Sequence, residues 1–196
     1  MKNNETGRSM VEMLGVLAII GVLSAGGLAG YSKAMFKHKL NSTMDQITML
    51  VTNIRTMYGT QGNYSGLDEA SAFDLGIVPA VMASDTRSGS SGAVALTNPF
   101  KGEVHISTVN AKDLSKTDVP TGFKLQYTGL PTEACIALAT ADFGSGAGSG
   151  FIGVGIATHK TSTGIGNNEG NAYEMDDAID KCDATSNNAT VNWYFY

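Results

Sequence analysis

An apolar run near the N-terminus constrains the fold of this chain most. From Met13 to Gly30, which is 18 residues, Ser24 is the only polar side chain. An α-helix needs roughly 20 apolar residues to cross a bilayer, so this run is close to the required length. One carboxylate, Glu12, directly precedes the run, although a charge at the bilayer centre costs about 2.5–3.5 kcal/mol. The sequence therefore predicts a membrane-spanning helix that carries an acid near one end.

The helical pattern continues beyond this run but changes character. After Lys39, apolar side chains recur at alternating steps of four and three and so form one stripe. The stripe consists of Leu40, Met44, Ile47, Val51, Ile54 and Tyr58. Asp45 and Arg55 fall off the stripe, which is typical of a helix packed on a globular domain. With Gly59 as a stop signal, we predict one helix from about Ser9 to Tyr58, half in lipid and half on a head domain.

The rest of the chain predicts helices and strands without regular alternation. Strands are predicted at 103–109, 123–127, 151–157 and 191–196, and short helices near 67–75, 129–142 and 173–182. The segment 59–100 is otherwise predicted to be loop, because it is rich in Gly, Ser and Thr. A helix followed by strands, without repeated βα units, indicates an α+β fold with an antiparallel sheet.

The two cysteines, Cys135 and Cys182, have two possible fates. In an exported head they should form a disulfide, whereas in a cytosolic one they would be two buried thiols. A bond between them would close a loop of about 48 residues, which the chain-entropy model values at roughly 4 kcal/mol. This loop contains the Gly-rich stretch at 144–150, which is the segment least able to hold itself in place. We therefore favour the disulfide if the head is exported.

No motif in the chain predicts an active site. Gly148, Gly150 and Gly153 match G-x-G-x-x-G, but a dinucleotide site needs this pattern between a strand and a helix, and here a predicted strand follows. The three histidines are isolated, and the acids at 174–177 fit a solvated helix face better than a cation site. We expect no catalytic residue, no metal and no cofactor. The net charge of -5 gives no sign of nucleic-acid binding, and the basic cluster at 33–39 is interpreted as solvated charge flanking the membrane.

The N-terminus resembles that of type IV prepilins, which begin with a short polar leader ending in Gly. Gly7 matches the last leader residue, Arg8 the first mature residue, and Glu12 the acid at mature position five within a hydrophobic helix. The C-terminal third resembles the type IVb branch in its two cysteine-bearing segments, GLPTEACIAL and the closing C…NATVNWYF. The resemblance covers the whole helix and both edges of the region between the cysteines.

This resemblance implies the type IV pilin fold, in which the long N-terminal helix packs on an antiparallel sheet and a disulfide bounds the C-terminal region. Residues 1–7 would be the prepilin leader, 8–36 the transmembrane or filament-core helix, and 37–196 the globular head. A prepilin peptidase would cut between Gly7 and Arg8 on the cytoplasmic face. In this family the new amine is commonly N-methylated.

The resemblance also supplies a role for the acid in the apolar helix. In a filament, Glu12 would meet the free amine of residue 8 in a neighbouring subunit. Opposite charges at close range in low dielectric favour each other's ionised forms, so docking is favoured in the register that pairs them. The alternative is an acid that snorkels from a helix end. Similarly, Gly26 and Gly30 either form a small-xxx-small contact with another helix or are ordinary transmembrane composition.

The expected function is a structural subunit of an extracellular type IVb pilus, used for adhesion, aggregation or conjugative contact. Its partners would be further copies of itself in a homopolymer, the prepilin peptidase, and the assembly machinery of the bacterial inner membrane, where the chain would reside before assembly. One alternative is a minor pilin or a type II secretion pseudopilin. Another is a single-pass membrane-anchored enzyme or binding protein, but this alternative leaves the spacing between Gly7 and Glu12 unexplained.

Overall fold

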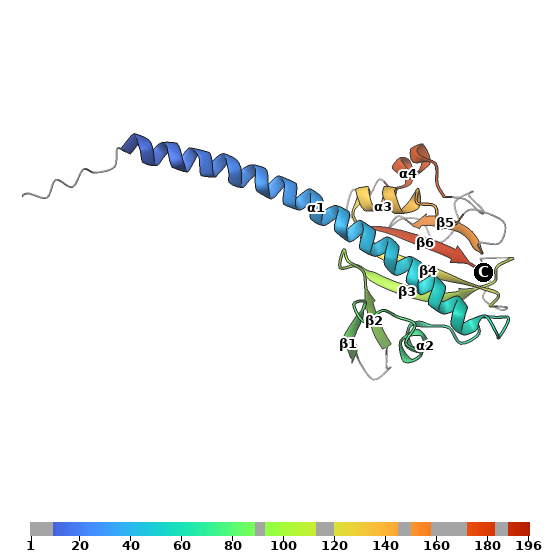
Figure 1. Cartoon of the computed structure of the whole chain (residues 1–196). Helices are drawn as coiled ribbons and strands as arrows, with labels where there is room; N and C mark the ends of the chain where they lie inside the picture. The colour runs from blue at the N-terminus through green and yellow to red at the C-terminus, as the bar shows by residue number, and fades with distance from the viewer. Residues whose placement is uncertain (1–9, 89–92, 113–119, 145–149, 158–171, 183–187) are drawn as a thin grey trace, which may run out of the picture. The chain divides into compact units, whose positions relative to one another are not determined.

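The computed structural model describes residues 10–88, 93–112, 120–144, 150–157, 172–182 and 188–196. The helices in these ranges are α1 (Met10–Tyr58), α2 (Glu69–Asp74), α3 (Thr132–Ala139) and α4 (Met175–Lys181). The strands are β1 (Ala83–Ser88), β2 (Ala93–Thr97), β3 (Glu103–Val109), β4 (Gly122–Leu130), β5 (Phe151–Ala157) and β6 (Ala189–Phe195) (Figure 1). The chain divides into two compact units, one ending at Lys39 and the other running from Leu40 to Tyr196.

Helix α1 contributes to both units and confirms the predicted single long helix. It runs without interruption because no proline occurs before Pro79, and proline is the residue that most strongly breaks a helix interior. At its end, the backbone N–H of Gly59 donates to the carbonyl oxygen of Arg55 at 2.8 Å. Within the described residues, α1 is also the one helix long and apolar enough to cross a membrane.

The strands form one antiparallel sheet in the order β1-β2-β3-β4-β6-β5. Strand β6 therefore lies between β4 and β5, although it follows both in the sequence. Its register is fixed on both sides, because Trp193 pairs with Leu125 of β4 and with Val154 of β5. This arrangement confirms the predicted α+β fold with an antiparallel sheet.

The second half of α1 packs on one face of this sheet and forms the core of the larger unit. Ile47, Leu50 and Ile54 are fully buried in the same cluster as Leu125 and Trp193. Fully burying one side chain of this size contributes roughly 1.5–3 kcal/mol. The predicted stripe is confirmed: its last four members are buried, and Leu40 and Met44 pack against them half-buried.

The expectation of loop over 59–100 is wrong for two stretches, which form β1 and β2. Strand β2 buries Val94 and Leu96 and pairs with β3 through Leu96 and Val104. Strand β1, with the sequence ASDTRS, carries no alternation of apolar and polar side chains and exists through its pairing with β2. Pairing with an adjacent strand overrides a weak local pattern, because β-propensity depends on the neighbouring strand.

Candidate functional site

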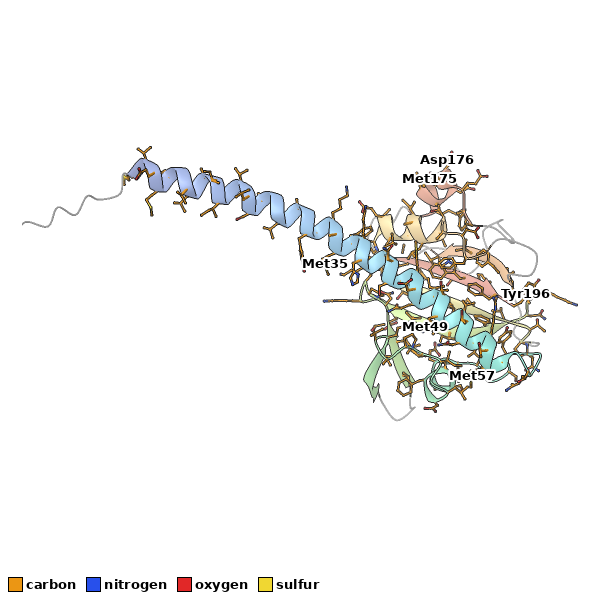
Figure 2. The ribbon with its side chains drawn as sticks, viewed as in Figure 1. Met35, Met49, Met57, Met175, Asp176 and Tyr196 are labelled. Atoms are coloured by element: carbon orange, nitrogen blue, oxygen red, sulfur yellow. A yellow bond between two sulfur atoms is a disulfide. The ribbon has the colours of Figure 1, made fainter. Side chains whose placement is uncertain are left out.

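The first half of α1 presents an apolar surface that the rest of this chain does not cover. Every residue from 10 to 34 is exposed, including Val11 at 76% and Leu28 at 70%. Figure 2 shows the side chains of this segment projecting around the helix. A contiguous apolar surface of this extent marks a site for lipid or for another protein. The segment is therefore the principal candidate site of the molecule.

Glu12 lies in the first turn of α1. An acid there interacts favourably with the partial positive charge at the helix N-terminus. It is the single carboxylate between residues 10 and 34. The two residues of the predicted cleavage site, Gly7 and Arg8, lie outside the described residues. The structure of one chain thus places the acid on the apolar surface, and its predicted partner belongs to another copy.

Gly26 and Gly30 lie one helical turn apart on the same exposed surface. A Cβ atom built at either position would meet no atom within 4 Å. Packing against the described part of the chain therefore does not require glycine at these positions. The absence of side chains would let another helix approach closely, so the predicted small-xxx-small contact stays a prediction about a second molecule.

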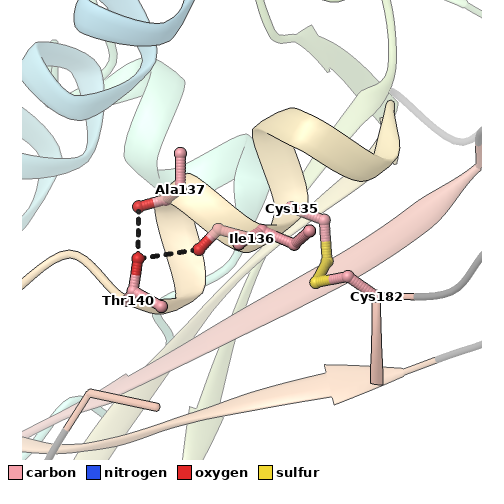
Figure 3. Close-up of a disulfide and its surroundings, with 5 residues drawn as sticks. All are labelled: Cys135, Ile136, Ala137, Thr140 and Cys182. Carbon is pink, nitrogen blue, oxygen red and sulfur yellow. Dashed lines mark hydrogen bonds between the residues drawn. A yellow bond between two sulfur atoms is a disulfide. The ribbon is translucent and has the colours of Figure 1, made fainter. Parts of the chain in front are cut away.

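The disulfide joins α3 to the end of α4. Cys135 and Cys182 are both fully buried, and their Cα atoms are 5.8 Å apart (Figure 3). Cys135 lies in the middle of α3, which ends at Ala139, where the hydroxyl of Thr140 donates to the carbonyl oxygens of Ile136 at 2.9 Å and Ala137 at 3.4 Å. The two cysteines are 47 positions apart. The predicted disulfide-bounded C-terminal region is confirmed.

Arg55 has a structural role that the sequence reasoning missed. It was placed off the apolar stripe, yet its side chain is half-buried. Its Nε donates to the backbone oxygen of Tyr196 at 3.2 Å, and its guanidinium carbon lies 5.5 Å from the centre of the Phe195 ring. Burial raises the pKa of the Tyr64 hydroxyl, and the nearby Arg55 guanidinium partly opposes that shift. Arg55 thus ties α1 to the end of β6.

The backbone around Arg55 is shaped to admit its side chain. Gly150 has a φ of +69°, and a Cβ there would collide with the Arg55 guanidinium. The carbonyl oxygen of Gly150 also accepts a hydrogen bond from the N–H of Tyr196 at 2.7 Å. The sequence holds one signal of this contact. Asp45 and Arg55 are the two charged residues between Leu40 and Tyr58, and a rare charge on a helix that packs against a core is a candidate for a specific contact.

The other polar candidates do not assemble into a chemical site. The acids at 174–177 are exposed, and in the part of the chain that the structure describes no group of His, Cys, Asp and Glu could hold a metal ion. The two ring nitrogens of His105 point to different carboxylates, with Nδ1 3.2 Å from Glu69 and Nε2 3.5 Å from Glu103. Gly150 and Gly153 precede and enter β5, so the glycine motif leads into a strand as predicted.

Comparison with known proteins agrees with these features. The Bundlin family model matches residues 33–196. The chain is 29% identical over 166 residues to a protein of Escherichia coli O111:H- named the major structural subunit of bundle-forming pilus, and equally similar to the protein of that name in Escherichia coli O127:H6. Each alignment covers 85% of this chain and 79% of the relative. The crystal structure of a type IVb pilin from Salmonella typhi matches with a TM-score of 0.55 at 19% identity, covering 78% of this chain and 97% of that one.

Proposed function

The chain belongs to the bundlin family of type IVb pilins, and we propose that it is a major pilus subunit that polymerises through the apolar half of α1. Its role is structural, as a subunit of an extracellular filament. The observation that carries the proposed mode of assembly is the surface of residues 13–30, which is apolar apart from Ser24 and wholly exposed among the described residues. Lipid can cover this surface before assembly, and the same surface of other copies can cover it in the filament.

The proposed determinant of register is Glu12. When a subunit docks, its Glu12 carboxylate would approach the free amine of residue 8 in a neighbouring copy. An unpaired carboxylate in the apolar core of a filament would be costly, and pairing removes most of that cost. Replacing both charges by apolar groups need not weaken a protein, because buried ion pairs often contribute little net stability. The pair is therefore proposed as a device for specificity.

Substitution of Glu12 tests this mechanism. Glu12→Gln keeps the size of the side chain and removes its charge, whereas Val11→Ala removes only apolar surface at the adjacent position. We expect Glu12→Gln to reach the membrane in wild-type amount and to yield no sheared surface filaments. Val11→Ala should yield filaments. Normal piliation by Glu12→Gln would contradict the pairing mechanism.

We propose further that the chain is inserted in the inner membrane as a precursor and cut between Gly7 and Arg8. Mass spectrometry of sheared filaments should then give an N-terminus at Arg8, with or without one methyl group. An N-terminus at Met1 in assembled material would exclude processing. The same preparation tests whether the chain is a major subunit, because a major subunit should dominate its protein content and a minor pilin or pseudopilin should not.

The downstream use of the filament is proposed to be adhesion or aggregation of cells. The support is the name of the relatives, which refers to a pilus that forms bundles. A strain without the chain should lose cell-to-cell clustering, and expression of the chain in that strain should restore it. Unchanged clustering together with lost mating-pair formation would indicate conjugative contact instead.

A further inference from the structure

Helix α4 exposes an apolar pair at the edge of its buried face. Ala178 and Cys182 of this segment face inward and are fully buried, whereas Met175 is 56% exposed and Ile179 is 50% exposed. Met175 and Ile179 are four residues apart, so they lie on one side of the helix. Figure 2 shows Met175 on α4 with Asp176 beside it. Met175 and Ile179 therefore form a small apolar patch, at the edge of the buried face, that the described part of the chain leaves half exposed.

This apolar pair is bordered by acids. Asp176 and Asp180 are exposed and four residues apart, and they form a row next to the apolar pair. Counting Glu174 and Asp177 as well, the segment has four carboxylates against the one cation of Lys181, a net charge of -3. A face of this composition selects a partner that is both basic and able to accept apolar side chains.

The smaller unit of the same chain carries a matching surface. Lys33 and Lys37 are exposed and four residues apart on α1, and we call these two residues the basic row. Neither makes an ion pair within the described residues, and the same is true of Asp176 and Asp180. Ala34, directly beside the basic row, is small and exposed. This leaves room for apolar side chains of a partner.

The position of the basic row is unexpected for a chain inserted as proposed above. Lys and Arg usually accumulate on the cytoplasmic side of a membrane helix, and the row lies after the apolar run, on the exported side. Solvated charge flanking the membrane, which is the interpretation from the sequence alone, therefore leaves unexplained why the cations lie on this side. An interaction outside the membrane would account for them.

We propose that α4 of one subunit docks on the basic row of α1 in a second copy of this chain, an interface that rests on the proposed assembly into a filament. Asp176 and Asp180 are separated by one helical turn, about 6 Å of rise, and so are Lys33 and Lys37. Two helices lying alongside each other can therefore pair both acids with both cations at once. Met175 and Ile179 then pack beside Ala34. The interface adds contacts between heads and helices to those between helices alone.

Charge reversal tests the interface. We expect Lys33→Glu with Lys37→Glu, and separately Asp176→Lys with Asp180→Lys, to lower the yield of sheared filaments at least about tenfold, because like charges face each other. The variant carrying all four changes should recover most of the yield. The control variant, Lys101→Glu with Lys112→Glu, makes the same change in net charge as Lys33→Glu with Lys37→Glu. Its substitutions lie at exposed sites of the head, and it should assemble normally. In every variant, the Cys135–Cys182 disulfide on a non-reducing gel reports that the head has folded.

Unchanged yield in either double variant, or no recovery in the fourfold variant, would overturn the interface. A loss at the basic row that the fourfold variant does not reverse would indicate that this row binds anionic lipid instead. In each case filaments from the wild-type chain would leave the proposed function intact, whereas absence of wild-type filaments would remove the function itself.

Zero-length cross-linking gives a second readout that does not depend on yield. Carbodiimide joins a carboxylate to an amine only when the two are in contact. Applied to wild-type filaments, it should link a peptide holding Lys33 or Lys37 to a peptide holding Asp176 or Asp180. The link should be absent from the detergent-solubilised monomer. Filaments in which no such link forms, or a monomer in which it forms equally, would overturn the proposal.

Discussion

The two halves of helix α1 bury their apolar side chains by different means. Between Leu40 and Tyr58, the apolar stripe is covered by the protein's own sheet, and Ile47, Leu50 and Ile54 are fully buried. Between Met10 and Ala34, the side chains are more uniformly apolar and yet all exposed. One continuous helix thus satisfies the hydrophobic effect within the molecule at one end and through other molecules at the other. Amphipathic patterning marks the first kind of burial and uniform apolarity marks the second.

The difference predicts that the two halves fail in different ways. Changes in the covered half should lower the free energy of unfolding of the head. Changes in the exposed half should leave the head stable and impair membrane insertion or filament formation. The free energy of unfolding of the full chain can be measured in detergent from the fluorescence of Trp193, the one tryptophan.

The largest expected effect comes from the disulfide. Replacing Cys135 and Cys182 by Ala should lower the free energy of unfolding by about 4 kcal/mol, because the unfolded chain loses a loop constraint. Insertion of the membrane helix should be unchanged, since the bond lies wholly within the head. A urea titration with a membrane fractionation measures both. Equal loss of insertion and of stability would contradict the separation of the two halves.

A paired substitution compares the halves directly. Leu50→Ala should cost about 3 kcal/mol, because a fully buried leucine leaves a cavity. Leu17→Ala makes the same chemical change on the exposed surface and should leave the urea midpoint of the head unchanged. If both variants shift the urea midpoint by a similar amount, residues 10–34 share the core of the head. The two halves of α1 would then not differ in how they are buried.

Arg55 is the polar exception within the covered half. Arg55→Met keeps an apolar stem but removes the donor to Tyr196 and the charge over the Phe195 ring, and should cost about 1–2 kcal/mol. Arg55→Lys keeps the charge without the planar guanidinium, so it should recover part of this loss. If Arg55→Met stabilises the head, the contact is incidental and burial of apolar surface alone decides stability in this half.

The smallest expected effect concerns the cap of α2. The Asp68 carboxylate accepts a hydrogen bond from the Ser71 N–H at 2.7 Å, and this bond lowers the pKa of Asp68 below its usual 3.8. Asp68→Ala should cost about 1 kcal/mol at pH 7.

The pH dependence of that effect follows from the sign of the shift. Because the pKa is lowered in the folded state, the stabilisation is complete above pH 3.8 and is lost as the pH falls through the lower folded value. Asp68→Asn is the matched control, since it retains the cap without titrating. A difference between wild type and Asp68→Asn that does not change with pH would contradict this assignment.

The main features of the fold follow from local sequence patterns. The apolar run and the stripe predicted α1 to within a residue of its observed end, because helical periodicity is a property of consecutive residues. Strands β1 and β2 were missed because their stability comes from pairing with each other and with β3. The contact between Arg55 and Tyr196 has a different cause that local patterns do not contain, since it joins residues 141 positions apart.

The candidate site was harder to predict, because most of it lies between molecules. Glu12 stands out in the sequence as an acid in an apolar helix, but its role stays a prediction because a single chain holds only one side of the pair proposed for it. The fate of the cysteines depended on the compartment, which composition left open, and the fold places the two sulfur atoms in bonding distance. Gly26 and Gly30 have no neighbour among the residues that the structure describes that would explain them.

The place of β6 between β4 and β5 also sets an order of events during biosynthesis. A ribosome completes the apolar half of α1 before any strand of the sheet has been translated, and β5 gains its partner only when residues 189–195 emerge. The sheet therefore cannot close until residues 189–195 have been made, so the head is the last part of the chain to fold.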